Sequence, residues 1–306
     1  MDLTLDPEAR ANLAALRLRV RATMEGVLSG LHRSPHQGQS VEFAEHKEYA
    51  PGDEIRHLDW KAYGKLDKYY VKRFEHETNL RAYLVVDASA SMAYASAPAS
   101  KLTHASIAAA ALAFLLVRQQ DAAGLCLARG DDVRFLPPRA SPAHATAILD
   151  LLGQTDARGP TRLSSAADLL SEKARRRALV LLFSDLLDGG DGLAKFLQLR
   201  ALGHEVAVFH VLDPAELTFP FEDPTLFLSM EDDRRIEANP LALREGYLEE
   251  MGRFLDEARR RCRAAGCDYE LLRTDEPPDR ALLRFLLRRD RRWTGEAVAR
   301  EHPGAG

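Results

Sequence analysis

The sequence has little cysteine, no long apolar run and no strong excess of charge of either sign. Three cysteines stand among 306 residues, and so low and odd a count is typical of a reducing compartment rather than of a disulfide framework. Cys262 and Cys267 lie close together, but two ligands make only half of a structural zinc site. No Cys/His pair of matching spacing completes it, so we expect the cysteines to pack in the core.

Nothing in the sequence predicts a membrane span or an export signal. The most apolar stretch, residues 107–117, is much shorter than the ~20 residues that cross a bilayer. The first seven residues lack the basic start and apolar run of a signal peptide. We therefore expect no membrane span and a cytoplasmic location.

The charge balance also argues against a nucleic-acid partner. A formal net charge of -4 gives no general attraction to nucleic acid or anionic lipid. Arginine clusters at residues 259–261 and 288–292 fall on or beside predicted amphipathic helices, where such charges usually form a solvated face.

From residue 80 onward, short apolar runs alternate with segments of helical periodicity. Strands are predicted at residues 83–86, 124–128, 133–136, 178–183, 206–212 and 269–272. Helices are predicted at residues 101–117, 142–152, 164–174, 193–202, about 247–262 and 280–287. This alternation is typical of an α/β protein with a doubly wound, mostly parallel sheet that is covered on both faces.

Three segments are predicted to flank or interrupt that domain, which we place at residues 80–290. Residues 1–79 are expected to form a helix that stops at Gly30, followed by a β-rich lead-in segment. Residues 214–240 interrupt the alternation of strands and helices, and we predict an inserted loop and hairpin there. Residues 291–306 are predicted to form a flexible tail.

Polar side chains follow two of the predicted strands. The run Asp87-Ala88-Ser89-Ala90-Ser91 comes directly after the first strand, and Asp185 ends the strand at residues 178–183. Thr161 stands in a loop that leads into a helix. In open α/β sheets, ligands bind beyond the carboxyl ends of the strands, so we expect these groups to gather there. Serine and aspartate after a strand are also common helix caps and turn formers, which is the alternative interpretation.

These five residues offer hard oxygen ligands of the kind that Mg²⁺ prefers, with Mn²⁺ and Ca²⁺ as other candidates. Two carboxylates balance the charge of the ion, and the neutral hydroxyls fill coordination positions without adding charge. An ion with so few charged ligands stays electrophilic, so it favours an outside carboxylate, such as an acidic residue of a partner protein.

The same positions resemble the metal-ion-dependent adhesion site of von Willebrand factor A domains. The resemblance covers roughly residues 80–289, and the glycine pair that usually precedes the threonine is here Gly159-Pro160. It implies a von Willebrand factor A-like fold and metal-liganding roles for Asp87, Ser89, Ser91, Thr161 and Asp185.

A second resemblance lies upstream. Glu42-Phe43, the run from Tyr49 to Arg56 with Pro51-Gly52-Asp53, Leu58-Asp59-Trp60 and the run from Tyr70 to Glu75 are similar to the bacterial domain-of-unknown-function 58 family. The resemblance implies a partnership with MoxR-type AAA+ ATPases and a chaperone-like or adaptor role. Many members carry N-terminal membrane helices, and we expect none here. We interpret Asp53, Arg56, Asp59 and Lys61, with Trp60, as a structural ion-pair network.

An enzyme is the main rival hypothesis. No G-x-S-x-G elbow, phosphate-binding loop or H-E-x-x-H motif is present, and Ser89 stands where an aspartate phosphotransferase usually has its second acid. A Mg²⁺-dependent, phosphatase-like hydrolase stays open as the alternative, because Mg²⁺ activates water. No side chain is marked as its base, so we predict a binding module and not an enzyme.

Overall fold

The computed structural model describes the backbone of residues 7–32, 46–48, 70–72, 80–130, 132–188 and 191–301. Side chains are described for residues 13–31, 80–130, 132–188 and 191–289. The chain divides into two units, His32–Asn79 and the remainder. In His32–Asn79, the strands β1 (His46–Glu48) and β2 (Tyr70–Lys72) pair antiparallel. Residues 41–43 and the predicted network of residues 53–61 lie outside the described residues.

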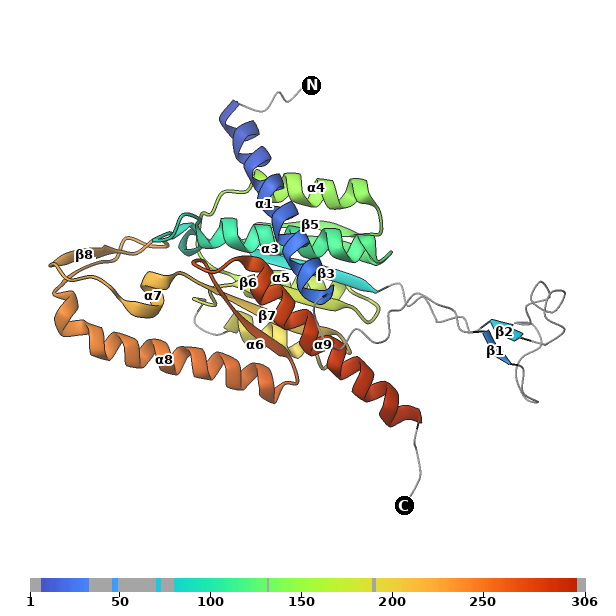
Figure 1. Ribbon diagram of the computed structural model, residues 1–306. Helices are drawn as coiled ribbons and strands as arrows, with labels where there is room; N and C mark the ends of the chain where they lie inside the picture. Colours follow the sequence, from blue (N-terminus) through green and yellow to red (C-terminus); the bar gives the residue numbers. More distant parts are fainter. Residues whose placement is uncertain are drawn as a thin grey trace, which may run out of the picture. The chain divides into compact units, whose positions relative to one another are not determined.

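A six-stranded sheet with the order β10-β7-β6-β3-β4-β5 forms the centre of the larger unit (Figure 1). The strands β3, β4, β6, β7 and β10 run parallel, and the edge strand β5 runs antiparallel to β4. This topology confirms the predicted fold class. The strand bounds are Arg81–Asp87 for β3, Ala122–Arg129 for β4, Asp132–Arg139 for β5, Leu179–Ser184 for β6, Glu205–Leu212 for β7 and Asp268–Arg273 for β10.

The strand β3 shows why the sheet is covered on both faces. Leu84 and Val86 belong to one buried cluster, whereas Tyr83 and Val85 belong to the other. Successive side chains of a strand point to opposite faces, so an unbroken apolar run needs a hydrophobic layer on each side.

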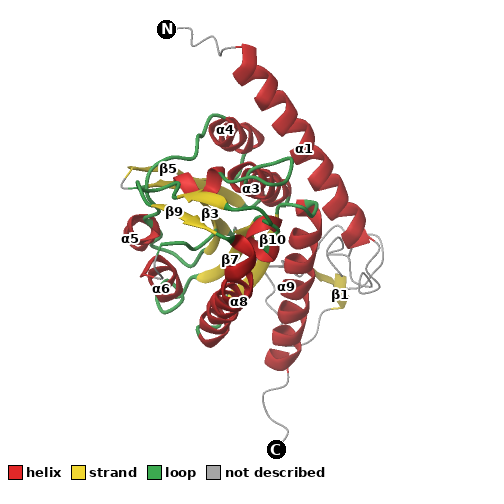
Figure 2. Ribbon diagram, turned by 90° about the vertical axis from the view of Figure 1, so that its left-hand side faces the viewer, coloured by secondary structure: helices red, strands yellow, loops and turns green. Residues whose placement is uncertain are grey.

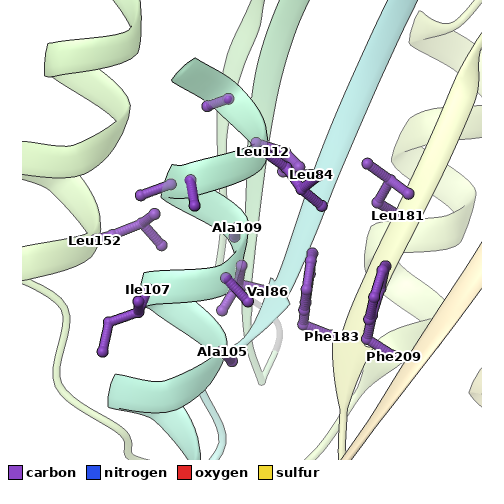
Figure 3. Packing of buried hydrophobic residues seen from close by; sticks show 14 of the residues in the cluster. Leu84, Val86, Ala105, Ile107, Ala109, Leu112, Leu152, Leu181, Phe183 and Phe209 are labelled. Carbon is purple, nitrogen blue, oxygen red and sulfur yellow. The ribbon is translucent and has the colours of Figure 1, made fainter. Parts of the chain in front are cut away.

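The helix α3 (Lys101–Arg118) covers the first face and is itself almost completely buried (Figure 3). Alanines 108–111 let the helix approach the sheet closely, and Ser100 caps it by accepting a hydrogen bond from the Thr103 amide. Phe183 and Phe209 stack beside it, with ring centroids 4.6 Å apart. One described helix, α3, is long and apolar enough to cross a membrane, and 83% of it is buried inside the protein.

Further helices complete the two layers (Figure 2). The helix α4 (Pro142–Gly153) packs with α3 in the first cluster. The opposite face is covered by α5 (Leu163–Lys173), α6 (Asp191–Gln198) and α8 (Pro240–Ala264). The three cysteines are buried and free, as the sequence predicts.

The two outer helices differ from the predictions. The helix α1 (Pro7–His32) buries Leu16, Val20 and Val27 in the first cluster, so it belongs with residues 80–306 and not with the lead-in segment. Gly30 does not end it: a Cβ there would lie 2.4 Å from Leu283 Cδ2, so this glycine allows close packing.

The helix α9 (Pro278–Glu301) continues well past the predicted end at residue 287, so the expected tail is helical as far as Glu301. Its polar residues predicted a flexible segment, but arginine, glutamate and alanine are also good helix formers. Residues 302–306 of the predicted tail lie outside the described residues.

A short helix and a hairpin lie within residues 214–240, where the sequence predicts an inserted loop and hairpin. The helix α7 (Pro214–Thr218) precedes β8 (Thr225–Leu228) and β9 (Arg235–Ala238), which pair antiparallel before α8 begins (Figure 1). The loop between these two strands, residues 229–234, is called the hairpin tip below.

Candidate functional site

The first three predicted site residues lie together where β3 ends. The backbone amide of Ser89 donates a hydrogen bond to Asp87 Oδ1 over 2.9 Å, and the hydroxyl oxygens of Ser89 and Ser91 lie 3.2 Å apart. All three side chains are buried. Ser89 stands at the N-cap of the short 3-10 helix Ala90–Ala93, but its side chain makes no capping hydrogen bond to that helix.

The strand β6 brings the second carboxylate beside the first. Because β3 and β6 pair in parallel, with Val86 opposite Phe183, both strands end at the same edge of the sheet. The Ser184 hydroxyl donates to Asp87 Oδ2 over 2.6 Å, and Asp185 follows it, fully buried. This edge is also the point where the strand order reverses, which is the usual ligand position in doubly wound sheets.

Burial, and then the negative charge of Asp185, raise the pKa of Asp87 to about 7. Hydrogen bonds from Ser184 and Ser89 lower the pKa of Asp87, but they offset only part of this increase. Among the described residues, none of the groups that chiefly determine the pKa of Asp87 is a cation. Asp87 would therefore gain from a positive charge placed beside it.

The loop that carries Thr161 lies against the Asp87 loop. The Ala90 amide donates to the Gly159 carbonyl over 2.9 Å, and the Arg158 amide donates to the Ala88 carbonyl over the same distance. Gly159 has φ +77°, a left-handed conformation that favours glycine. Thr161 itself is nearly buried, and both its amide and its hydroxyl donate to Glu231 of the hairpin tip.

Lys101 is a buried cation that the sequence analysis missed. Its Nζ donates to Asp185 Oδ2 over 2.7 Å and to Glu216 Oε1 over 2.6 Å, and its side chain is fully buried. Burial lowers the pKa of Lys101, but the two carboxylates outweigh it, so the pKa is raised and the ammonium stays charged. Lys101 ties the site to the insertion, because Glu216 belongs to α7.

His210 holds the backbone of Asp185. Burial lowers the pKa of His210 to about 4, so the ring is neutral at physiological pH. Its Nε2 lies 3.0 Å from the Asp185 carbonyl, which only accepts, so Nε2 carries the proton. Nδ1 then accepts from the Tyr269 hydroxyl over 2.8 Å.

The sequence analysis missed four residues of this site: Ser184, Lys101, Glu216 and Glu231. Ser184 directly precedes Asp185 at a strand end, and that position alone was a usable signal. Lys101, Glu216 and Glu231 stand in ordinary helix or loop contexts and reach the site only through the fold.

The donor set fits a hard divalent cation. Two carboxylates and three hydroxyls gather at one edge, and all of these groups present oxygen atoms. Within the described residues, no group of three or more His, Cys, Asp or Glu side chains is placed to hold a metal. An ion at this edge would therefore depend on hydroxyls and retained waters besides Asp87 and Asp185, as Mg²⁺ usually does.

A cleft of about 320 Å³ opens beside Ser91. Its lining includes Tyr94, Lys101, Leu187, Glu216 and several residues of β8 and the hairpin tip. Aliphatic side chains around it are exposed, among them Leu187, Leu228 and Met230. The cleft therefore connects Ser91, one of the predicted metal ligands, to these exposed aliphatic side chains.

Comparison with known proteins gives relatives of similar length but without an assigned function. Uncharacterized proteins of Mycobacterium bovis and Mycobacterium tuberculosis are 30% identical over 291 residues, which is 94% of this chain and 91% of each relative.

Solved structures give weaker likenesses. BatB, a conserved hypothetical protein from Bacteroides thetaiotaomicron, is 17% identical, with a TM-score of 0.43 over 68% of this chain and 98% of that one. The VWA domain of SpRpn10 is 8% identical, with a TM-score of 0.39 over 66% and 93%. At these values the likenesses carry no inference about function.

The family comparison is decisive. Residues 45–253, more than half of the chain, match the model of the DUF58 family, described as a protein of unknown function. The upstream motif resemblance pointed to the same family. The chain belongs to the DUF58 family.

Proposed function

We propose that this protein is a metal-dependent protein-interaction module that binds one divalent cation, Mg²⁺, through Asp87, Ser89, Ser91, Thr161 and Asp185. The observation that carries the proposal is the convergence of two buried carboxylates and three hydroxyls at the switch point of the sheet. No cation is among the described groups that chiefly determine the pKa of Asp87, so the ion would supply a positive charge beside this carboxylate. When bound, the ion offers a Lewis-acidic position to a carboxylate of a partner.

The surroundings of the site support a protein as the partner. Large apolar side chains are exposed on the insertion and at the start of α8, which is unusual for a surface without a binding role. They include Leu226, Leu228, Met230, Ile236, Leu241 and Leu243. A cation-bound carboxylate surrounded by apolar contacts would combine a specific polar contact with a hydrophobic interface core.

The family resemblance directs the choice of partner. We infer that the partner is a MoxR-type AAA+ ATPase and that this protein acts as an adaptor or co-chaperone in the cytoplasm. This inference rests on the resemblance of the motifs, and the site contributes only the demand for an acidic residue on the partner.

A Mg²⁺-dependent hydrolase is the less favoured alternative. It needs a general base beside the ion, but the His210 ring is used by Asp185 and Tyr269. The Lys101 ammonium is bound by two carboxylates. These contacts favour binding over hydrolysis, and a phosphatase assay of the metal-loaded protein tests the alternative directly.

The first test is metal binding. Asp87→Asn keeps the shape of the side chain and removes its charge, so we expect it to weaken Mn²⁺ or Mg²⁺ binding in calorimetry by at least 10-fold. Asp156→Asn is the matched control, because Asp156 is exposed and, among the described residues, forms its ion pair with the exposed Arg158. Unchanged metal affinity in Asp87→Asn would refute the assignment of the site.

The second test concerns the partner. Pulldown from the native host with Mg²⁺, and again with a chelator, should recover an AAA+ ATPase only in the presence of metal. Asp87→Asn should lose this recovery, whereas Asp156→Asn should keep it. If the ATPase is recovered equally with Mg²⁺, with the chelator, with Asp87→Asn and with Asp156→Asn, the cation does not mediate the contact.

A further inference from the structure

The hairpin tip places an acidic residue of this chain directly on a predicted metal ligand. Glu231 Oε2 accepts from the Thr161 amide over 3.0 Å, and Oε1 accepts from the Thr161 hydroxyl over 2.5 Å. These residues are 70 positions apart, so the contact is made by the fold and not by local sequence.

Hydrogen bonds within the hairpin tip hold its conformation. The Ser229 amide donates to the Arg234 carbonyl over 2.9 Å, which closes the loop. The Ser229 hydroxyl oxygen accepts from the amides of Glu231 and Asp232, at 3.4 and 3.3 Å. These bonds hold the backbone of the loop from which the Glu231 side chain reaches Thr161.

The base of the hairpin is anchored by aromatic packing. Phe219, Phe221 and Phe227 contact one another, and Tyr247 of α8 stacks on Phe219 with ring centroids 4.4 Å apart. Arg244 donates to the carbonyls of Phe219 and Phe221. The hairpin is therefore held at its base, and the two Glu231 bonds hold its tip at the site.

Charge explains why this contact points to a cation. Glu231 and Glu216 line the same cleft as Ser91 and Lys101. Asp185 and Glu216 share the buried ammonium of Lys101, and Glu231 adds a further carboxylate to the lining of the cleft. Arg234 also lines the cleft, but its guanidinium pairs with Asp232 of the hairpin tip. Like charges gathered in this way repel one another. The Thr161 hydroxyl donates its one proton in the hydrogen bond to Glu231, and the lone pairs of its oxygen remain available to an ion.

We infer that Glu231 is an internal acidic ligand of the cation site, in the position that the proposed function assigns to a carboxylate of the partner. The inference rests on the proposed function. A partner would then have to displace the hairpin tip, so that Glu231 both strengthens binding of the ion and restricts access to it.

The experiment uses Mn²⁺ alone as the probe, with the full chain. Glu231→Gln keeps the size of the side chain and one hydrogen-bond acceptor but removes the charge. Glu237→Gln is the matched control, because Glu237 is an exposed residue of β9 in the same hairpin. Mn²⁺ affinity is measured by calorimetry, and amide hydrogen exchange of residues 229–234 is measured with and without Mn²⁺.

We expect Glu231→Gln to weaken Mn²⁺ binding about 10-fold or more, and Glu237→Gln to leave it unchanged. Mn²⁺ should slow exchange at the hairpin tip of the wild type but not of Glu231→Gln. Equal Mn²⁺ affinity in the wild type and Glu231→Gln, or no Mn²⁺ effect on exchange, would overturn the inference and leave the metal site standing. A wild type that binds no Mn²⁺ would overturn the proposed function together with this inference.

Discussion

Replacing Lys101 with methionine tests the electrostatic account of the site. The ammonium bridges Asp185 and Glu216, and the Lys101 and Asp185 side chains are both fully buried. Methionine has a similar length and leaves no large cavity, so the main loss is the positive charge. Two carboxylates would then stay in the interior without their cation.

The expected cost is large. Removing one partner of a buried ion pair leaves an uncompensated charge and typically lowers the free energy of unfolding by about 3–5 kcal/mol. For a domain of this size, about 1 kcal/mol shifts the melting temperature by roughly 2–4 °C, so K101M should melt roughly 6–20 °C below the wild type. Lys195→Met is the control, since its pair with Asp168 is exposed and is worth at most about 1 kcal/mol.

The assay is thermal and urea unfolding in the presence of a chelator, and then in Mg²⁺. Under the proposed function, Mg²⁺ should restore more stability to K101M than to the wild type, because the variant has one more uncompensated negative charge beside the ion. A K101M protein as stable as K195M in the chelator would refute the argument that this ammonium balances the buried carboxylates.

Two further predictions concern stability away from the site. His104 is buried and has no hydrogen-bond partner for either ring nitrogen among the described residues, and burial lowers its pKa to about 4. The unfolded ring, with a pKa near 6.5, binds a proton that the folded ring refuses, so stability is lost as the pH falls from about 6.5 toward 4. At pH 5 this loss is about 2 kcal/mol. In urea unfolding at pH 5.0 against 7.5, H104L should therefore lose about 2 kcal/mol less than the wild type, while the loss caused by His210, whose pKa is also lowered to about 4, remains in both. Gly124 lies where a Cβ would sit 2.8 Å from the Leu136 carbonyl oxygen of β5, so G124A should cost about 1–3 kcal/mol in the same assay. Gly252, with nothing near its Cβ position in the exposed part of α8, is the control, and G252A should be neutral or stabilising.

Each of these predictions has a clear contrary outcome. An H104L protein that loses as much stability as the wild type between pH 7.5 and 5.0 would show that another group causes the acid sensitivity. A G124A protein as stable as G252A would show that β5 moves aside without cost.

Local pattern determined the fold class and part of the site. The alternation of apolar strands with amphipathic helices is enough to predict a parallel sheet, because each strand must bury both faces and each helix one. The positions of Asp87 and Asp185 at strand ends then placed both carboxylates at one edge. This follows from the sequence because parallel strands end on the same side of the sheet, so residues that follow their last positions lie at a common edge.

Tertiary structure decided which groups face those carboxylates. Lys101 reaches Asp185 across 84 positions, and Glu231 reaches Thr161 across 70, so neither pairing leaves a trace in local periodicity. Gly30 looks like a helix stop in sequence, but Leu283 of α9 gives it a packing role. The sequence alone thus determined the elements and their buried faces, while the charge balance around the two carboxylates depended on contacts between distant segments.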